Sequence, residues 1–98
     1  MKKEKNQDPL KVAITGTLDL HDYNPNDIKP LILEYLYQCQ QKGLSHGRII
    51  HGKGIGTLRD IVHSILKKHK DVCSFGICPP TAGGWGATFF TLKLMEQI

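Results

Sequence analysis

The chain has 98 residues, 40% of them hydrophobic, and a formal net charge of +4. This length accommodates one small domain and excludes a second hydrophobic core, and no apolar run approaches the roughly 20 residues of a membrane span. The polar beginning "MKKEKNQDP" lacks the apolar core of a signal peptide. We therefore expect residues 1–10 to form a flexible polar tail and residues 11–98 to form a single domain.

The segment 11–20, "KVAITGTLDL", alternates between apolar and polar residues, which predicts a strand with one buried face. The inward series is Val12, Ile14, Leu18 and Leu20, and the outward series is Thr15, Thr17, Asp19 and His21.

Two helices are predicted from apolar residues that repeat with the 3.6-residue period. The first follows a capping segment at Asn24 or Asn26 and stops at Gly43, and the second begins near Thr57. Their buried stripes are, in chain order, Ile28, Leu31, Ile32, Tyr35, Leu36 and Cys39, then Leu58, Ile61, Val62, Ile65 and Leu66.

Three more strands are predicted, over residues 47–50, 72–78 and 86–94. Their inward residues are Cys73, Phe75 and Ile77 in the second of these strands, and Phe90, Leu92 and Leu94 in the third. The order β-α-β-α-β-β predicts an α/β fold, a two-layer α/β sandwich whose four-stranded mixed sheet carries both helices on one face. The first two strands should be parallel, joined by a right-handed crossover.

The remaining polar and sulfur residues are expected to be structural. Three cysteines, an odd number without a CxxC spacing, predict reduced thiols and a cytoplasmic protein. Cys39 and Cys73 should fill the core, and His46, His63 and His69 should lie on solvated faces.

The stretch "HGKGIG" places three glycines at alternate positions, Gly52, Gly54 and Gly56. Backbone amides at a helix N-terminus approach an anion closely when no side chains intervene. Lys53 and Arg59 add positive charge, and His51 can exchange a proton near neutral pH. The spacing matches neither a Walker A loop nor GxGxxG, so the predicted ligand is a phosphate rather than a nucleotide cofactor. A tight turn with a solvated lysine is the alternative.

Asp19 and His21 should lie close to this loop, because the carboxyl ends of parallel strands meet helix N-termini at one sheet edge. A carboxylate beside an imidazole can orient it for proton transfer or bind a metal ion. A pair that only caps the following turn is the alternative.

Aromatic side chains of the last hairpin extend this surface. Trp85 lies between two glycines in the loop, and Phe89 and Lys93 face outward from the last strand. Exposed rings beside basic groups can stack on unpaired bases. A dimer contact for Phe89 and a lid over the core edge for Trp85 are the alternatives.

Three motifs together resemble those of the small MutS-related (Smr) domain: "LDLH" at 18–21, "IIHGKGIGTLR" at 49–59 and "GGWGATFFTL" at 83–92. The resemblance spans residues 11–94 and implies a sandwich similar to the C-terminal domain of bacterial translation initiation factor three. It also implies DNA or RNA binding, with nicking activity in parts of the family. In this chain Asp22 stands where the family usually has glycine, and its carboxylate can repel phosphate or add a metal ligand beside Asp19.

Carried over by position, the resemblance implies site roles for Asp19 and His21, for His51, Gly52, Lys53, Gly54 and Gly56, and for Gly84, Gly86 and Thr88, which would shape the hairpin beside the site.

The sequence therefore predicts a nucleic-acid-binding domain that is a candidate nicking endonuclease on branched or single-stranded DNA, or on RNA. The predicted catalytic residues are Asp19, His21 and His51, and the predicted phosphate and base contacts are Gly52, Lys53, Gly54, Gly56, Arg59, Trp85, Phe89 and Lys93. Binding needs no cofactor, whereas cleavage could use Mg²⁺ or Mn²⁺, with Asp19 and Asp22 as candidate ligands. A non-catalytic binding or adaptor module of the same fold, and a small enzyme acting on a phosphorylated metabolite, are the alternatives.

Overall fold

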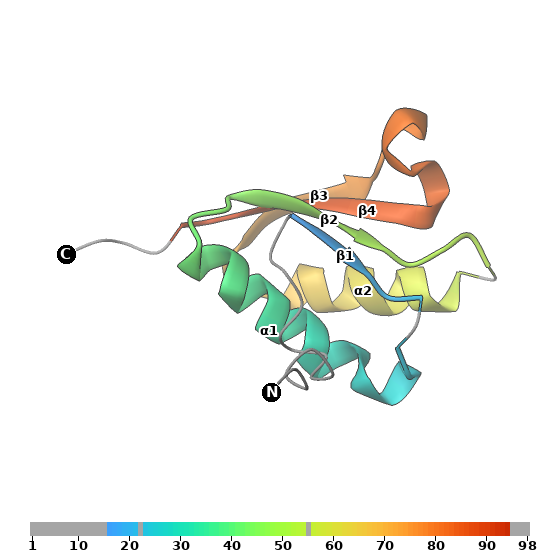
Figure 1. The fold of residues 1–98 in the computed structure, drawn as a ribbon, viewed down its shortest axis with the longest axis horizontal. Helices are drawn as coiled ribbons and strands as arrows, with labels where there is room; N and C mark the ends of the chain where they lie inside the picture. The colour runs from blue at the N-terminus through green and yellow to red at the C-terminus, as the bar shows by residue number, and fades with distance from the viewer. Residues whose placement is uncertain (1–15, 22, 55, 95–98) are drawn as a thin grey trace, which may run out of the picture.

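The computed structural model describes residues 16–21, 23–54 and 56–94. Its elements, coloured along the chain in Figure 1, are β1 (Thr17–Asp19), η3 (Pro25–Asp27), α1 (Ile28–Gln41), β2 (His46–Ile50), α2 (Thr57–Lys68), β3 (Val72–Ile77), η4 (Pro80–Ala82), η5 (Gly84–Gly86) and β4 (Ala87–Leu92). The predicted order β-α-β-α-β-β is confirmed, with three short 3-10 helices (η) added. The predicted tail over 1–10 and the first residues of the predicted first strand lie outside the described residues.

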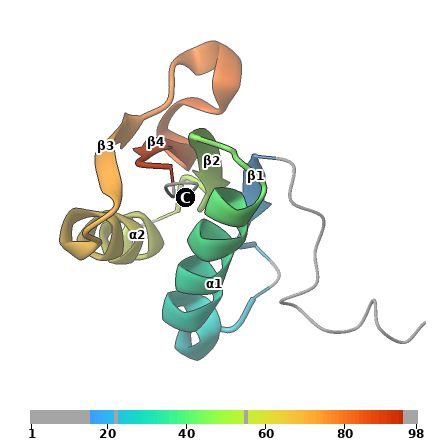
Figure 2. The same cartoon turned by 90° about the vertical axis from the view of Figure 1, so that its left-hand side faces the viewer.

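The four strands form one sheet in the order β1-β2-β4-β3. β1 and β2 are parallel, as predicted, whereas β4 is antiparallel to both β2 and β3. Both helices cover one face of this sheet, and the η4–η5 segment rises on the side of the other face (Figures 1 and 2). The predicted two-layer sandwich with a mixed sheet is therefore confirmed.

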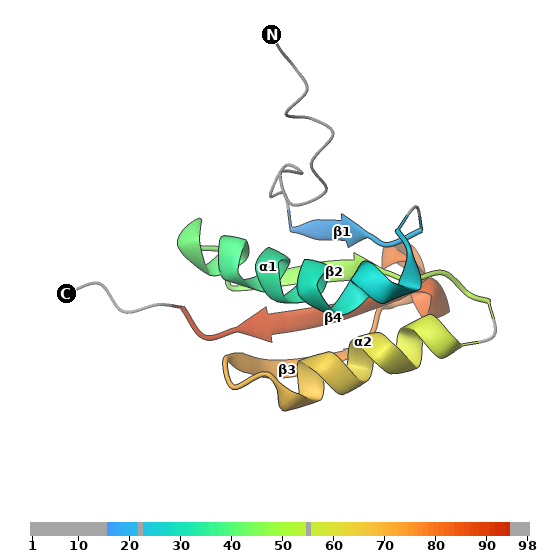
Figure 3. The same ribbon diagram turned by 90° about the horizontal axis from the view of Figure 1, so that it is seen from below.

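The core lies between the sheet and the two helices. Figure 3, a view from below, shows both helices in front of the strands. All six apolar residues of the predicted α1 stripe are buried, because their spacing keeps them on one side of the helix. At the centre of the sheet, Ile49 and Phe90 are fully buried. Gly47 allows Phe90 to lie close to the backbone, because a Cβ at Gly47 would be 2.6 Å from the phenyl ring.

The predicted inward residues of the third strand are wrong in two positions. Cys73 is exposed, because a β-bulge between Val72 and Ser74 makes it an extra residue in the pairing with β4. Ile77, near the end of this edge strand, is also exposed. Leu94, predicted to face inward, is exposed beyond the end of β4.

Phe90 and Phe89 are neighbours on opposite faces of the sheet, so matched substitutions at these two positions test which face is buried. We expect Phe90→Ala to lower the free energy of unfolding by about 3–5 kcal/mol, since it empties a fully buried site. Phe89→Ala should cost about 1 kcal/mol, because that ring is partly exposed on the open face. Urea unfolding followed by circular dichroism measures both, and equal losses would contradict the assignment of faces.

Candidate functional site

Three segments meet at the edge of the sheet where β1 and β2 end and α2 begins (Figure 1). Leu20 donates its amide to the carbonyl of Ile50 at 2.9 Å, which continues the parallel pairing past the strands. The amides of His51 and Gly52 both donate to the carbonyl of Gly86, at 2.9 Å each. The "LDLH", "HGKGIG" and "GGWGAT" segments are thus joined by backbone hydrogen bonds.

The glycine loop presents the N-terminus of α2 without a capping side chain. Gly56 occupies the N-cap position with φ 88°, a left-handed conformation that favours glycine. The guanidinium of Arg59 folds back over this terminus, since a Cβ at Gly56 would lie 2.7 Å from its Nη2 atom. The partial positive charge of the helix end and the Arg59 cation therefore reinforce each other.

A cavity of about 240 Å³ opens at this helix end. It is lined by residues of the glycine loop, the first turn of α2 and η3: Pro25, His51, Gly52, Gly54, Gly56, Thr57, Leu58, Arg59 and Ile61. A Cβ added at Gly52 or Gly54 would meet nothing within 4 Å, so these backbones are openly accessible. The amide of Gly52 is already bonded to Gly86, so the helix end and Arg59 are the better anion contacts.

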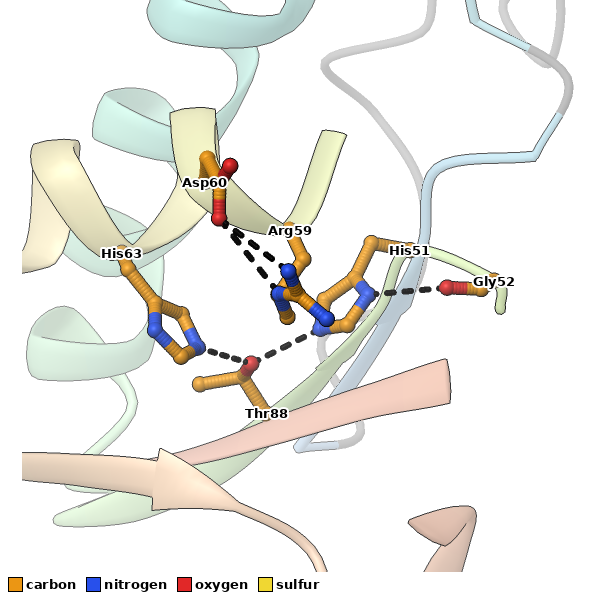
Figure 4. Close-up of polar contacts among 6 residues, drawn as sticks. All are labelled: His51, Gly52, Arg59, Asp60, His63 and Thr88. Atoms are coloured by element: carbon orange, nitrogen blue, oxygen red, sulfur yellow. Dashed lines mark hydrogen bonds and ion pairs between the residues drawn. The ribbon is translucent and has the colours of Figure 1, made fainter. Parts of the chain in front are cut away.

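His51, which the sequence predicts to be a proton-transferring group, is buried. Only 6% of its surface is exposed. Its Nε2 atom lies 2.8 Å from the Thr88 hydroxyl oxygen, and its Nδ1 atom lies 3.1 Å from the carbonyl oxygen of Gly52 (Figure 4). The Nε2 atom of His63 reaches the same hydroxyl at 2.7 Å. His51, Thr88 and His63 therefore form one chain of hydrogen bonds, which we call the His–Thr–His chain.

The donors in the His–Thr–His chain follow from the carbonyl at its end. A carbonyl only accepts, so Nδ1 of His51 carries the proton, and in a neutral ring its Nε2 atom is then an acceptor. Thr88 donates its single proton to His51, and its oxygen accepts from the Nε2–H of His63. Both ring nitrogens of His51 therefore have hydrogen-bond partners, the Gly52 carbonyl at Nδ1 and the Thr88 hydroxyl at Nε2.

The surroundings favour neutral rings in this chain. Burial lowers the pKa of His51, and the Arg59 cation lowers it further, against an opposing effect of the hydrogen bond to Gly52. Burial also lowers the pKa of His63, and the charges of His51 and Arg59 lower it further, whereas the Asp60 carboxylate raises it.

His63 is the residue that sequence reasoning missed, because it was expected on a solvated face. It packs against Phe75 with ring centroids 5.1 Å apart and is partly buried. Its position one helical turn after Arg59 and next to buried Val62 was the available signal. Its partner Thr88, 25 positions later, could not be inferred from helical periodicity.

Asp19 and His21 remain at the surface, on the same edge. A carboxylate oxygen of Asp19 accepts the amide of His21 at 3.0 Å and lies 3.9 Å from its Nδ1 atom. Asp19 thus caps the turn while its side chain and the imidazole stay 53% and 75% exposed. Asp22 lies outside the described residues, and within those described no group of three or more metal-ligating side chains occurs.

The three predicted contacts of the last hairpin lie at three different places. Trp85 is 74% exposed and lines a cavity together with Lys53. Phe89 lies on the open face, two residues into β4. Lys93 follows the other end of β4, where its backbone bonds to Asp71 and Gln40. The structure therefore does not bring Lys93 to the site, because β4 starts at the site and runs away from it.

The fold and this edge define a small α/β domain that holds a glycine loop between two sequence-distant motifs. The chain belongs to the Smr domain family, whose sequence model matches residues 18–93. It is 36% identical over 99 residues to "Endonuclease MutS2" of Staphylococcus carnosus strain TM300, and 42% identical over 81 residues to that of Staphylococcus aureus. These matches cover 94% and 83% of this chain, but 13% and 11% of the relatives, so the chain spans a small part of their length.

Two solved structures share the fold. The Smr domain of Thermus thermophilus MutS2 superposes with a TM-score of 0.76 and 33% identity, covering 81% of this chain and 99% of that one. YdaL, a stand-alone small MutS-related protein from Escherichia coli, gives a TM-score of 0.75 and 26% identity, covering 80% and 64%. No helix among the described residues has the length and apolar character needed to cross a membrane.

The hydrogen-bond donors in the His–Thr–His chain can be measured directly. We expect ¹⁵N NMR near neutral pH to show His51 protonated at Nδ1 and His63 at Nε2. Thr88→Val should shift both sets of ring signals and lower the free energy of unfolding by about 1–3 kcal/mol, because it leaves buried polar atoms without partners. Thr88→Ser, which keeps the hydroxyl, is the control. A His51 ring protonated at Nε2 would contradict the assignment.

Acid should weaken the domain through the same two histidines. Their pKa values are lowered on folding from a usual value of about 6.5, so the unfolded chain binds these protons first as the pH falls. The stabilisation is complete above about pH 6.5 and is lost as the pH falls through the folded-state values. Urea unfolding as a function of pH measures the slope, which should be smaller in His63→Gln. An equal slope in both proteins would contradict this origin.

Proposed function

We propose that the chain binds nucleic acid by its phosphodiester backbone at the amino end of α2. The observation that carries this proposal is the uncapped helix end at Gly56, with the Arg59 guanidinium folded over it beside an open cavity. Helix N-termini with accessible backbone are favourable sites for phosphate oxygens. The net charge of +4 and the similarity to proteins named endonucleases support a polyanionic ligand.

Each cation has a distinct part in this proposal. Arg59 presents a planar guanidinium that can contact two phosphate oxygens, although Asp60 at 3.4 Å shares it. Lys53 is exposed on the glycine loop and supplies a second positive charge. The His–Thr–His chain acts indirectly, since it fixes the carbonyl of Gly52 and therefore the direction in which the loop leaves β2.

We further propose that Asp19 and His21 cleave the bound strand. In hydrolysis a water oxygen attacks phosphorus, its proton is accepted by a base, and the bond to the leaving oxygen breaks as that oxygen takes up a proton. A carboxylate and an imidazole 3.9 Å apart at an exposed turn suit these two transfers.

A second candidate function is nucleic-acid binding without cleavage. The hydrogen bond from the His21 amide to the Asp19 carboxylate favours it, because this bond alone accounts for an aspartate at the turn.

Under either function, the three free cysteines favour the cytoplasmic location expected from the sequence.

Asp19→Asn separates the two functions, because the amide oxygen can still accept the His21 amide while the charge is removed. If Asp19 is catalytic, nicking of branched, single-stranded or duplex substrates should fall by about a hundredfold or more with binding retained. His21→Gln should behave in the same way. Assays with and without Mg²⁺ or Mn²⁺ measure the rate, and unchanged nicking in both variants would contradict the assignment.

Binding is tested with two lysines at opposite ends of the sheet. Lys53→Gln should weaken binding of a labelled oligonucleotide by about tenfold, because one charge-assisted phosphate contact is lost. Lys93→Gln removes the same charge away from the site and should change the affinity less than about twofold. Fluorescence anisotropy at low salt measures both. Equal effects would place the binding surface elsewhere, and no binding by the unmodified chain would reject the proposal.

A further inference from the structure

Trp85 and Lys53 share a cavity on the side of the glycine loop that faces the η4–η5 segment. The cavity measures about 270 Å³, and its other lining residues are Pro80, Gly83 and Gly84. Trp85 is 74% exposed, an unusual position for the largest apolar side chain. Pockets for drug-sized ligands range from about 300 to 1,000 Å³. This cavity therefore has room for one planar group, open to solvent, beside a cation.

The turn that carries Trp85 is held firmly by backbone and side-chain contacts. Within it, the amides of Ala82 and Gly84 donate to the carbonyl of Pro79 at 2.8 and 3.0 Å. Arg48 on β2 ties the turn to the sheet, because its Nη1 atom donates to the carbonyl of Ala82 at 2.7 Å. The ring of Trp85 is therefore presented from a fixed support.

Lys53 is held against the same turn. The glycine loop and the turn are joined at Gly86, whose carbonyl accepts two loop amides. A Cβ at Gly86 would lie 3.3 Å from Cγ of Lys53, so the aliphatic stem of the lysine lies along this glycine. The first part of the lysine side chain and the backbone that carries the indole are thus joined through Gly86, rather than belonging to two independent loops.

We propose that this cavity is a subsite for one unpaired nucleotide, whose base stacks on Trp85 while its phosphate contacts Lys53. The inference rests on the proposed function and names its substrate class. An indole face stacks on any base, but a base inside a duplex has its faces covered by neighbouring base pairs. The subsite therefore selects single strands, flaps or loops over continuous duplex.

The occupant is a nucleotide rather than an apolar protein segment because of what surrounds the ring. Glycines form two of the lining positions and offer no side-chain contacts to an apolar partner. A lysine supplies the opposite charge to a phosphate, and lysine is depleted at protein–protein interfaces, where tryptophan is enriched. The combination of an exposed ring and a cation is the arrangement used to bind single strands.

Trp85 is the only tryptophan of the chain, so its fluorescence reports on the subsite directly. We expect a single-stranded oligonucleotide to quench its emission, and a blunt-ended duplex of the same sequence to quench it little. Anisotropy of labelled strands gives the two affinities in parallel. Trp85→Ala should lower the ratio of single-strand to duplex affinity by about tenfold or more, whereas Trp85→Phe keeps a stacking ring and should retain most of it.

Lys53→Gln serves as the matched comparison, because losing a phosphate contact should weaken both ligands and leave their ratio nearly unchanged. Bound single strand without quenching, or an unchanged affinity ratio in Trp85→Ala, would overturn the subsite while leaving the proposed function intact. Failure of every nucleic acid to bind the unmodified chain would overturn both. Thermal unfolding of each variant shows that it is folded.

Discussion

The carbonyl oxygen of Gly86 is the atom on which the arrangement of the site depends, because it accepts the amides of both His51 and Gly52. A Cβ at Gly86 would lie 3.3 Å from Cγ of Lys53, so the lysine side chain would have to shift slightly, and 3.5 Å from the carbonyl carbon of Gly52, which is an ordinary contact. The contact joins the loop at residues 51–56 to η5, which follows α2, β3 and η4 along the chain. It determines where Lys53 and Trp85 lie relative to each other and directs His51 toward Thr88.

Burial divides the polar residues of this edge into two groups with different capacities. His51, Thr88 and His63 satisfy one another's hydrogen bonds, as buried polar groups must. Both ring nitrogens of His51 are engaged in this chain, Nδ1 by the Gly52 carbonyl and Nε2 by the Thr88 hydroxyl. Asp19, His21 and Lys53 are exposed and can meet a ligand. His21 and His51, the histidines of the first two motifs, therefore differ in exposure, and the motif pattern alone does not reveal this difference.

The sequence predicts those features whose cause is local. The 3.6-residue period placed all six α1 residues in the core, because one helix face meets one sheet. The period-two pattern failed in β3, because the bulge at Cys73 adds a residue that alternation cannot reveal. The alternation in the last strand correctly predicted that Lys93 is exposed. It could not predict at which end of the sheet Lys93 lies, because that depends on the direction in which β4 pairs with β2. His63 was missed because its partner lies on another element.

The two cavities lie on either side of one short loop, since Gly52 lines the cavity at the helix end and Lys53 lines the one beside Trp85. A strand that contacted both would pass from one side of this loop to the other. Double-stranded DNA resists bending over a persistence length of about 150 base pairs, whereas an unpaired strand bends freely. The positions of the two cavities therefore agree with the proposed ligand, a flexible strand with exposed bases.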